Sequence, residues 1–172
     1  ELDDHGGWPL KNVWQIVSCS EQKDVDDFIP LLLNTPAIIR GVSLEPLLGP
    51  VDITDYLVMT ARTNREAYLD WAIAGGESGS SGRFMHPEWE SSVRDQCALG
   101  GAAYFLKQWG AWAWAPEELN YEQALAWGRE KFGQRVSYKH HSSGHTAFRV
   151  GKRKSGALRD GVAHMAWPEV RA

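Results

Sequence analysis

The sequence has little cysteine and no long apolar run. Its two cysteines, Cys19 and Cys97, lie far apart, and neither belongs to a Cys-x-x-Cys spacing. Because an iron–sulfur cluster normally takes three or four thiolates, this chain alone cannot build one, and we expect two buried thiols. No stretch approaches the roughly 18 apolar residues of a membrane span, and the first residues lack the basic and apolar regions of a signal peptide. These absences predict a cytoplasmic protein with no membrane partner.

The sequence also lacks a large excess of charge of either sign. Its 172 residues carry 18 Lys and Arg against 22 Asp and Glu, and this net charge of −4 gives no general attraction to nucleic acids or anionic membranes. A hydrophobic content of 43% and this length predict one globular domain with a sizeable core. Nine tryptophans are many for this size, and we expect most in core or subunit contacts. The start at Glu1 rather than Met suggests a fragment, a processed product or an incompletely built start.

A short apolar run, Trp71–Ala74, stops abruptly at Gly75, Gly76 and Glu77. The run does not alternate, which suits a strand of a parallel sheet covered on both faces, although so short a run is also compatible with a helix. The glycines allow a sharp turn or a close approach to a bound group. Glu77 and Ser78 then follow the carboxyl end of the strand, where α/β proteins usually present their chemistry. A glycine turn with a solvated glutamate is the simpler alternative.

Strand and helix patterns alternate between residues 12 and 110. Strands are predicted at 12–18, 37–44, 71–74 and 102–106. No hairpin signal joins them, so the pattern favours parallel βαβ units with right-handed crossovers. A closed (β/α)₈ barrel needs roughly 250 residues, so closure within this chain is excluded. We therefore predict an α/β protein whose parallel βαβ units form a half or partial (β/α) barrel.

The helices between these strands have start and stop signals. Ser18 and Glu21 form a capping-box pattern, and the helix after them contains Pro30, so we expect a kink or two short helices. Asp52 is predicted to cap a short helical turn, and residues 60–66 read as a surface connection. A second helix is predicted to begin at Pro87, because proline favours the first helical position, and to end at residues 100–101.

Polar side chains follow each of the later predicted strands. Glu45 follows the second strand and Lys107 follows the fourth, so we interpret Glu45, Glu77 and Lys107 as catalytic candidates. Further ligand-binding candidates are Gly75, Gly76, Ser78, Arg83 and Gln108. Alternatives stay open, because Glu45 also suits a cap or an ion pair, Lys107 could pair with Glu45 or Glu77, and Arg83 could be an ordinary surface arginine.

The character of the sequence changes at Pro116. We therefore divide the chain into a βαβ half-barrel, residues 1–115, and an irregular α+β extension, residues 116–172, packed on it as one structural domain. A helix is predicted at 117–127 and a short strand at 132–138. The histidines between residues 140 and 145 resemble a metal tract, but no acidic or cysteine partner lies at ligand spacing, so we predict no metal site.

The extension also carries a cluster of basic residues. These are Arg149, Lys152, Arg153, Lys154 and Arg159. Five cations could hold a phosphate backbone, and Lys152, Arg153 and Lys154 are the nucleic-acid candidates. A solvated loop is the alternative, because aromatic residues do not alternate with the cations as they do in single-strand-binding proteins.

Several motifs occur in an order and spacing that span nearly the whole chain. They are Asn12-Val13-Trp14, Ile29-Pro30-Leu31-Leu32-Leu33, Ser43-Leu44-Glu45-Pro46-Leu47-Leu48-Gly49-Pro50-Val51-Asp52, Gly75-Gly76-Glu77-Ser78-Gly79, Met85-His86-Pro87, Arg94-Asp95-Gln96-Cys97 and Phe105-Leu106-Lys107-Gln108-Trp109-Gly110. This set resembles a phage-associated family of uncharacterised proteins. Longer members of that family resemble radical S-adenosylmethionine proteins, with an upstream cysteine triad for a [4Fe–4S] cluster and a partial (β/α) barrel.

The resemblance implies that this chain corresponds to the C-terminal part of such a protein, located in the cytosol of the host cell. Glu45, Gly75, Gly76, Glu77, Lys107 and Gln108 are the site-lining residues that it carries over. The chain lacks the triad, so either an upstream segment or separate chain supplies the cluster and S-adenosylmethionine is the cofactor, or this half works by binding alone. A rival hypothesis is a non-catalytic phage accessory protein that binds a host protein or nucleic acid. A third is a half-barrel that dimerises to complete its sheet.

Overall fold

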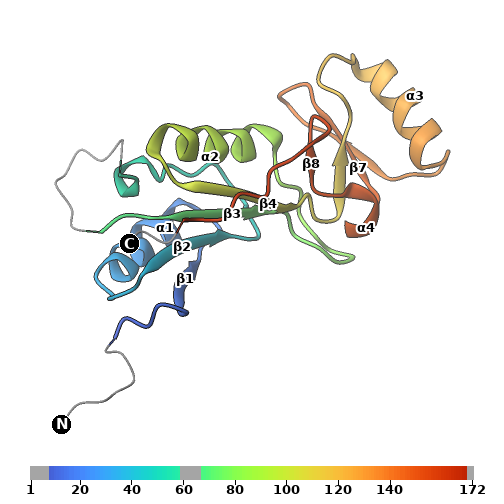
Figure 1. The fold of residues 1–172 in the computed structure, drawn as a ribbon. Coiled ribbons are helices and arrows are strands. Elements are labelled where there is room, and N and C mark those ends of the chain that lie inside the picture. Colours follow the sequence, from blue (N-terminus) through green and yellow to red (C-terminus); the bar gives the residue numbers. More distant parts are fainter. Residues whose placement is uncertain (1–7, 59–66, 170–172) are drawn as a thin grey trace, which may run out of the picture.

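The computed structural model describes residues 8–58 and 67–169. Its centre is a parallel sheet in the order β1-β2-β3-β4, made of β1 (Trp14–Ser18), β2 (Ile39–Leu44), β3 (Trp71–Gly75) and β4 (Ala103–Gln108). The predicted alternation of parallel strands with helices is therefore confirmed (Figure 1). β4 is longer than predicted, and it includes Lys107 and Gln108.

Helices α1 (Gln22–Leu33) and α2 (Pro87–Gly100) cover one face of this sheet. Their buried side chains share a single core with alternate residues of the strands, such as Val42, Ala72 and Leu106. Because all the strands are parallel and neighbours in sequence are neighbours in the sheet, both helical crossovers lie on the same side. The described residues include no helix that combines the length and apolar content needed to cross a membrane.

Details of the first helix differ from the prediction. α1 begins at Gln22 after Glu21, without a side-chain cap, and the Ser20 N–H donates instead to Asp24 Oδ2 at 2.8 Å. The predicted capping box at Ser18 is therefore wrong. The helix also continues through Pro30 as one element, because the loss of a single donor is small beside the burial of its apolar face.

The second helix follows the prediction at both ends. α2 begins at Pro87, its N-cap His86 accepts a hydrogen bond from the Glu88 N–H, and Gly101 ends it with a positive φ of 78°. Before β3, Asp52 accepts from the Thr54 N–H at the start of the short 3₁₀ helix η1 (Thr54–Tyr56), close to the predicted turn. The predicted surface connection at 60–66 lies outside the described residues.

A smaller antiparallel sheet follows, in the order β5-β7-β6. It consists of β5 (Trp112–Trp114), β6 (Tyr138–His140) and β7 (Thr146–Arg149), and α3 (Tyr121–Phe132) packs against it. The predicted helix at 117–127 starts later, because Asn120 and Gln123 form a capping box. The predicted strand at 132–138 is wrong in its bounds, since Gly133 ends α3 with a φ of 104° and pairing begins only at Tyr138.

The last segment returns to the parallel sheet. After α4 (Lys152–Ser155), the short hairpin of β8 (Leu158–Arg159) and β9 (Val162–Ala163) leads residues 164–167 along the outer edge of β4. There the Leu106 N–H donates to His164 O at 2.8 Å and the Ala166 N–H donates to Tyr104 O at 3.1 Å. The segment thereby covers the β4 edge of the sheet, whereas β1 ends the sheet on the other side.

Candidate functional site

The carboxyl ends of β2, β3 and β4 bring Glu45, Gly75 and Lys107 together. Lys107 Nζ donates to Glu45 Oε2 at 2.6 Å, so this lysine pairs with Glu45 and not with Glu77. A Cβ on Gly75 would lie 3.0 Å from the Glu45 carboxyl carbon, and glycine there leaves room for the carboxylate. Three of the predicted site residues thus meet around Glu45, whose side chain is mostly buried.

Gln108 lies beside Glu45 and has an unpartnered buried acceptor. Its Nε2 donates to Glu45 Oε1 at 2.5 Å and to Gly76 O at 3.4 Å. Both partners are acceptors, so the amide nitrogen must face them and Oε1 must face away. Gln108 is 6% exposed, and among the described residues no donor reaches its Oε1. Buried acceptors are rarely left without a donor, so this atom stands out among the polar groups at the strand ends.

Gly76 is required by close backbone packing rather than by an unusual dihedral angle. A Cβ at this position would lie 2.2 Å from Trp109 O, and the Gly76 N–H donates to Gln108 O at 2.9 Å. Neither Gly75 nor Gly76 has a positive φ. The backbone after β3 therefore lies in contact with the backbone after β4, and this contact fixes the relative position of the two strand ends.

Glu77 and Arg83 form a separate ion pair in the loop after β3. Arg83 Nε and the Arg83 N–H both donate to Glu77 Oε2 at 2.8 Å, and Arg83 Nη2 donates to Oε1 at 3.1 Å. The side-chain hydrogen bond from Arg83 is the main reason that the pKa of Glu77 falls to about 2. Arg83, a predicted ligand-binding residue, thus holds a carboxylate of this chain. Ser78 lies exposed in the same loop.

The cysteines are unsuited to metal or cluster binding. Cys19 and Cys97 are free and buried, on different elements, and burial raises the pKa of Cys19 to about 11 and that of Cys97 to about 12. Over residues 8–58 and 67–169, no group of three or more His, Cys, Asp or Glu side chains is arranged to hold a metal ion. A [4Fe–4S] cluster therefore does not fit the thiols that the structure describes.

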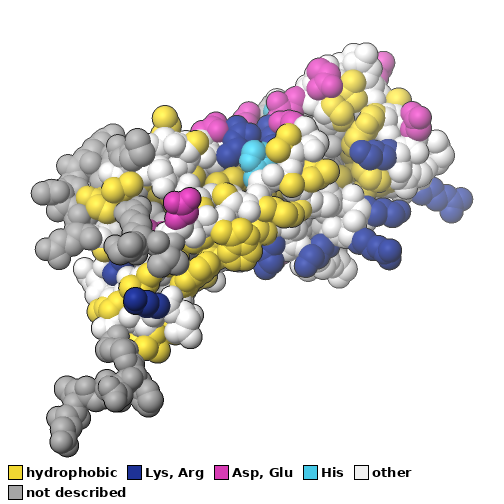
Figure 2. Space-filling view, viewed as in Figure 1, with side chains coloured by type: hydrophobic (Ala, Val, Ile, Leu, Met, Phe, Trp, Pro, Cys, Tyr) yellow, Lys and Arg dark blue, Asp and Glu magenta, His cyan; other side chains and the backbone are white. Residues whose placement is uncertain are grey.

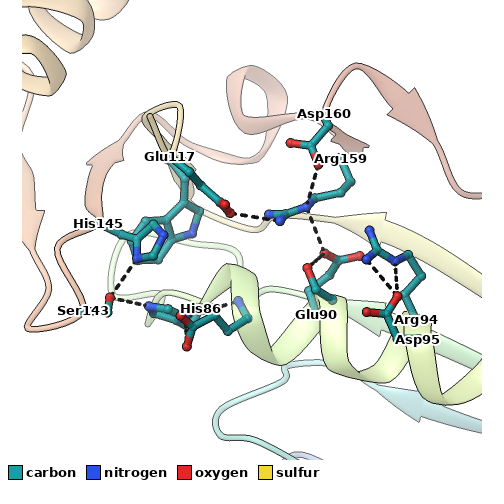
Figure 3. A network of polar contacts seen from close by, with 12 residues as sticks. His86, Glu90, Arg94, Asp95, Glu117, Ser143, His145, Arg159 and Asp160 are labelled. Atoms are coloured by element: carbon teal, nitrogen blue, oxygen red, sulfur yellow. Dashed lines mark hydrogen bonds and ion pairs between the residues drawn. The ribbon is translucent and has the colours of Figure 1, made fainter. Parts of the chain in front are cut away.

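A histidine cluster lies away from this site, where α2 meets the β6–β7 turn (Figure 3). Buried His86 contacts Ser143 Oγ through Nε2 at 2.9 Å, and His141 and His145 contact the same oxygen through Nδ1 at 2.8 and 2.9 Å. Burial lowers the pKa of His86, and its Nδ1 accepts from the Glu88 N–H, so its proton lies on Nε2 and is donated to Ser143. The sequence suggested the tract alone, because His86 is distant from it along the chain.

A second polar network surrounds the buried carboxylate of Glu90 (Figure 3). The Tyr104 hydroxyl donates to Glu90 Oε1 at 2.6 Å, and burial raises the pKa of Tyr104 above its ordinary value. Arg159 Nε lies 3.7 Å from Glu90 Oε2, and its Nη2 donates to Glu117 at 3.0 Å. Glu90 was not predicted as a functional residue, although its spacing from Val93 and Cys97 places it on the buried face of α2.

The predicted basic cluster divides into two parts. Lys152, Arg153 and Lys154 are exposed on α4, as Figure 2 illustrates with the dark blue side chains gathered on that part of the molecule. Arg149 lies half-buried beside them, with its guanidinium 5.3 Å from the Trp112 ring centre. Arg159 does not belong to this cluster, because its side chain is 14% exposed and pairs with carboxylates.

Comparison with known proteins places the chain in a family without assigning an activity. A family model described as "Protein of unknown function (DUF5131)" matches residues 2–168. No curated protein matches the sequence. No solved structure matches the chain.

Proposed function

This chain belongs to the DUF5131 family of proteins of unknown function, and from its own site we propose that it binds a small ligand with an amino-acid moiety at the strand ends of a partial (β/α) barrel. Following the resemblance to a phage-associated family, we further propose that the ligand is S-adenosylmethionine and that the chain is the C-terminal part of a radical S-adenosylmethionine-like protein. The observation that carries the proposal is the buried, unpartnered Oε1 of Gln108 beside the Glu45 carboxylate.

The polar groups of the site complement a zwitterion. A ligand ammonium group has only donors, and the Glu45 carboxylate and Gln108 Oε1 are acceptors on adjoining side chains at the strand ends. The Lys107 ammonium pairs with Glu45, and because its side chain is about half exposed it can also reach a ligand carboxylate. Gly75 keeps a side chain out of the space next to the Glu45 carboxylate. Binding in this way would give Gln108 Oε1 a donor. It would also pair the Lys107 ammonium with the ligand carboxylate as well as with Glu45.

The described residues do not themselves supply the radical chemistry of S-adenosylmethionine. S-adenosylmethionine supplies a carbon radical only when a reduced iron–sulfur cluster cleaves it, and the described thiols do not fit such a cluster. The role of this chain is therefore to bind and orient the ligand. Cluster ligands would come from an upstream segment or a separate chain, and with neither the protein would act by binding alone.

The open face of the parallel sheet supports a partner that completes a barrel. Opposite the helices, Trp14, Trp71, Phe105 and Trp167 pack against one another, with the Trp71 and Trp167 ring centres 4.8 Å apart. Ile16 of the edge strand is 42% exposed and Trp167 is 60% exposed. Such a surface suits further strands, from an N-terminal half or a second copy, which would extend the sheet from β1.

Isothermal titration with S-adenosylmethionine and with 5′-methylthioadenosine, which lacks the amino-acid moiety, tests the ligand. We expect the first to bind and the second to bind at least about tenfold more weakly, since a lost charge-assisted hydrogen bond costs about 1.5–3 kcal/mol. Gln108→Met, which removes the acceptor at similar volume, should weaken S-adenosylmethionine binding and leave methylthioadenosine binding unchanged. Glu88→Gln, on the exposed start of α2, is the control. Equal affinity for the two ligands, or no binding, would contradict the proposal.

A further inference from the structure

The C-terminal extension contains a shallow groove between the α3–β6 loop, β7 and α4. Its lining includes the cations Arg135, Arg149 and Lys154, the polar residues Gln134 and Ser137, and no acidic residue. Lys152 and Arg153 stand exposed on the same short helix as Lys154. We call these five cations the groove cations. The groove therefore concentrates positive charge within a chain whose net charge is −4.

The groove cations differ from several other cations of the chain in their ion pairing. Lys23, Arg83, Arg94, Lys107 and Arg159 each form an ion pair with a carboxylate. Within the described part of the chain, none of the groove cations forms such a pair. A cation paired with a carboxylate is partly neutralised, whereas an unpaired one keeps its full attraction for an anion. The groove is thus available to an anionic partner without the loss of existing ion pairs.

The fold holds these cations on ordered elements. Arg149 Nη2 donates to Gly82 O at 3.4 Å, and the Trp112 ring lies against its guanidinium group. The Ser155 hydroxyl donates to Gly110 O at 2.6 Å and so fixes α4 to the loop that follows β4. The cations come from three separate segments, which spreads them along the groove. A single phosphate would meet only a few of them, whereas a chain of phosphates would meet several.

We propose that this groove binds the phosphodiester backbone of a nucleic acid without reading its sequence. Phosphate contacts supply affinity and salt dependence but no base specificity, and the groove offers mainly cations. Phe132 is the aromatic side chain in the lining, so stacking of successive bases is not the main contribution. The inference is independent of the proposed strand-end site, because none of the groove residues belongs to it.

Fluorescence anisotropy with a labelled mixed-sequence oligonucleotide, as a single strand and as a duplex, tests this inference. We expect log affinity to fall linearly with log salt between about 50 and 200 mM, with little difference between unrelated sequences. Lys152→Gln/Lys154→Gln should weaken binding roughly tenfold and reduce the magnitude of the salt slope by about 2. The control Lys11→Gln/Lys23→Gln changes the net charge equally on exposed residues elsewhere and should leave the slope unchanged.

Three outcomes would overturn the inference. The first is no oligonucleotide binding at the lowest salt concentration. The second is an equal loss of affinity in the two double variants, which would show a general charge effect. The third is binding to phosphatidylserine vesicles but not to oligonucleotides, which would assign the groove to a membrane surface. Because the substituted lysines are exposed, thermal melts of both variants should match the unmodified protein, and both remain testable.

Discussion

The parallel sheet with its two helices and the C-terminal extension are stabilised in different ways. The parallel sheet packs its helices in one continuous core, in which residues such as Ile29, Leu44 and Leu106 are fully buried. The antiparallel sheet has only two small clusters, one around Trp112 and one around Phe148. Burial of apolar area is the main favourable term in folding, so the extension depends more on its attachment to the parallel sheet.

That attachment uses tryptophan side chains that are both apolar and polar. The indole N–H groups of Trp109, Trp112 and Trp114 donate to the carbonyl groups of Leu158, Gly82 and Met85 at 2.8, 2.7 and 2.9 Å. Each ring buries a large area while its N–H satisfies a backbone acceptor. Three of the nine tryptophans thus lie at the junction between the two regions. The comparison predicts that changes in the extension will act locally and that changes in the parallel sheet will act globally.

The largest effect is expected from Phe148→Ala. Phe148 is fully buried against Trp127 and Phe132, so its truncation should lower the free energy of unfolding by about 4 kcal/mol. Hydrogen exchange should speed up in β6, β7 and α3 while β2 and β3 stay protected. Phe28→Ala, at a position that is 42% exposed, is the control, with less than about 1 kcal/mol expected. Equally fast exchange in the parallel strands would contradict the expectation that changes in the extension act locally.

Gly76→Ala should show that the strand ends of the parallel sheet are rigid. The new Cβ would meet the backbone of Trp109 at 2.2 Å, and backbone cannot move aside as a side chain can, so we expect a loss of about 3 kcal/mol. Gly49→Ala meets nothing within 4 Å and should change stability by less than about 0.5 kcal/mol. Denaturant melts measure both values, and similar values for the two variants would disprove the rigidity.

Arg159→Gln tests the polar attachment of the last hairpin to α2. The change leaves the buried Glu90 carboxylate without its cation, and we expect a loss of about 2 kcal/mol, measured by denaturant melts. The double variant Arg159→Gln/Glu90→Gln should recover part of that loss, because the buried charge is then also removed. Glu117→Gln removes an exposed partner of Arg159 and should cost less than about 1 kcal/mol. A double variant that is no more stable than the single one would count against this account.

The smallest effect concerns pH and His86. Its pKa is lowered by burial, so the unfolded chain binds its proton more readily than the folded chain, and stability falls as the pH drops below about 6.5. His86→Asn keeps an N-cap acceptor for α2 and cannot be protonated. The decrease in Tm between about pH 7.5 and 5.5 should therefore be smaller in this variant. Glu88, His141, His145 and Glu117 also act on His86, so an unchanged decrease would assign the pH dependence to other groups.

Strand-end residues could be predicted from the sequence because parallel strands place their carboxyl ends at one edge. Glu45, Gly75 and Lys107 follow or end different strands, and pairing of those strands was enough to bring them together. The partner of Glu77 could not be predicted in the same way. Arg83 reaches Glu77 through a loop whose shape depends on the hydrogen bond from the Trp112 indole to Gly82 O. The periodicity of the sequence gives no signal for such a contact.

Contacts between segments that lie far apart in the sequence could not be predicted. Ser143 contacts His86 across 57 residues, and Arg159 meets Glu90 only because the chain returns to α2 at its end. Arg159 was grouped with the cations of α4 because of its charge and position in the sequence. In the structure, however, the Arg159 side chain is mostly buried and the α4 cations are exposed. The unpartnered oxygen of Gln108 was also out of reach, because it follows from the orientation of an amide between two acceptors.

The indole hydrogen bonds also bear on the order in which the chain is made. The carbonyl groups of Gly82 and Met85 are synthesised 30 and 29 residues before the indoles of Trp112 and Trp114 that satisfy them. During translation, the loop that carries Glu77 and Arg83 therefore emerges well before its partners. The strands that flank it can pair first, since chains fold progressively from the N-terminus. The loop next to the strand-end site would then reach its final shape only when the extension leaves the ribosome.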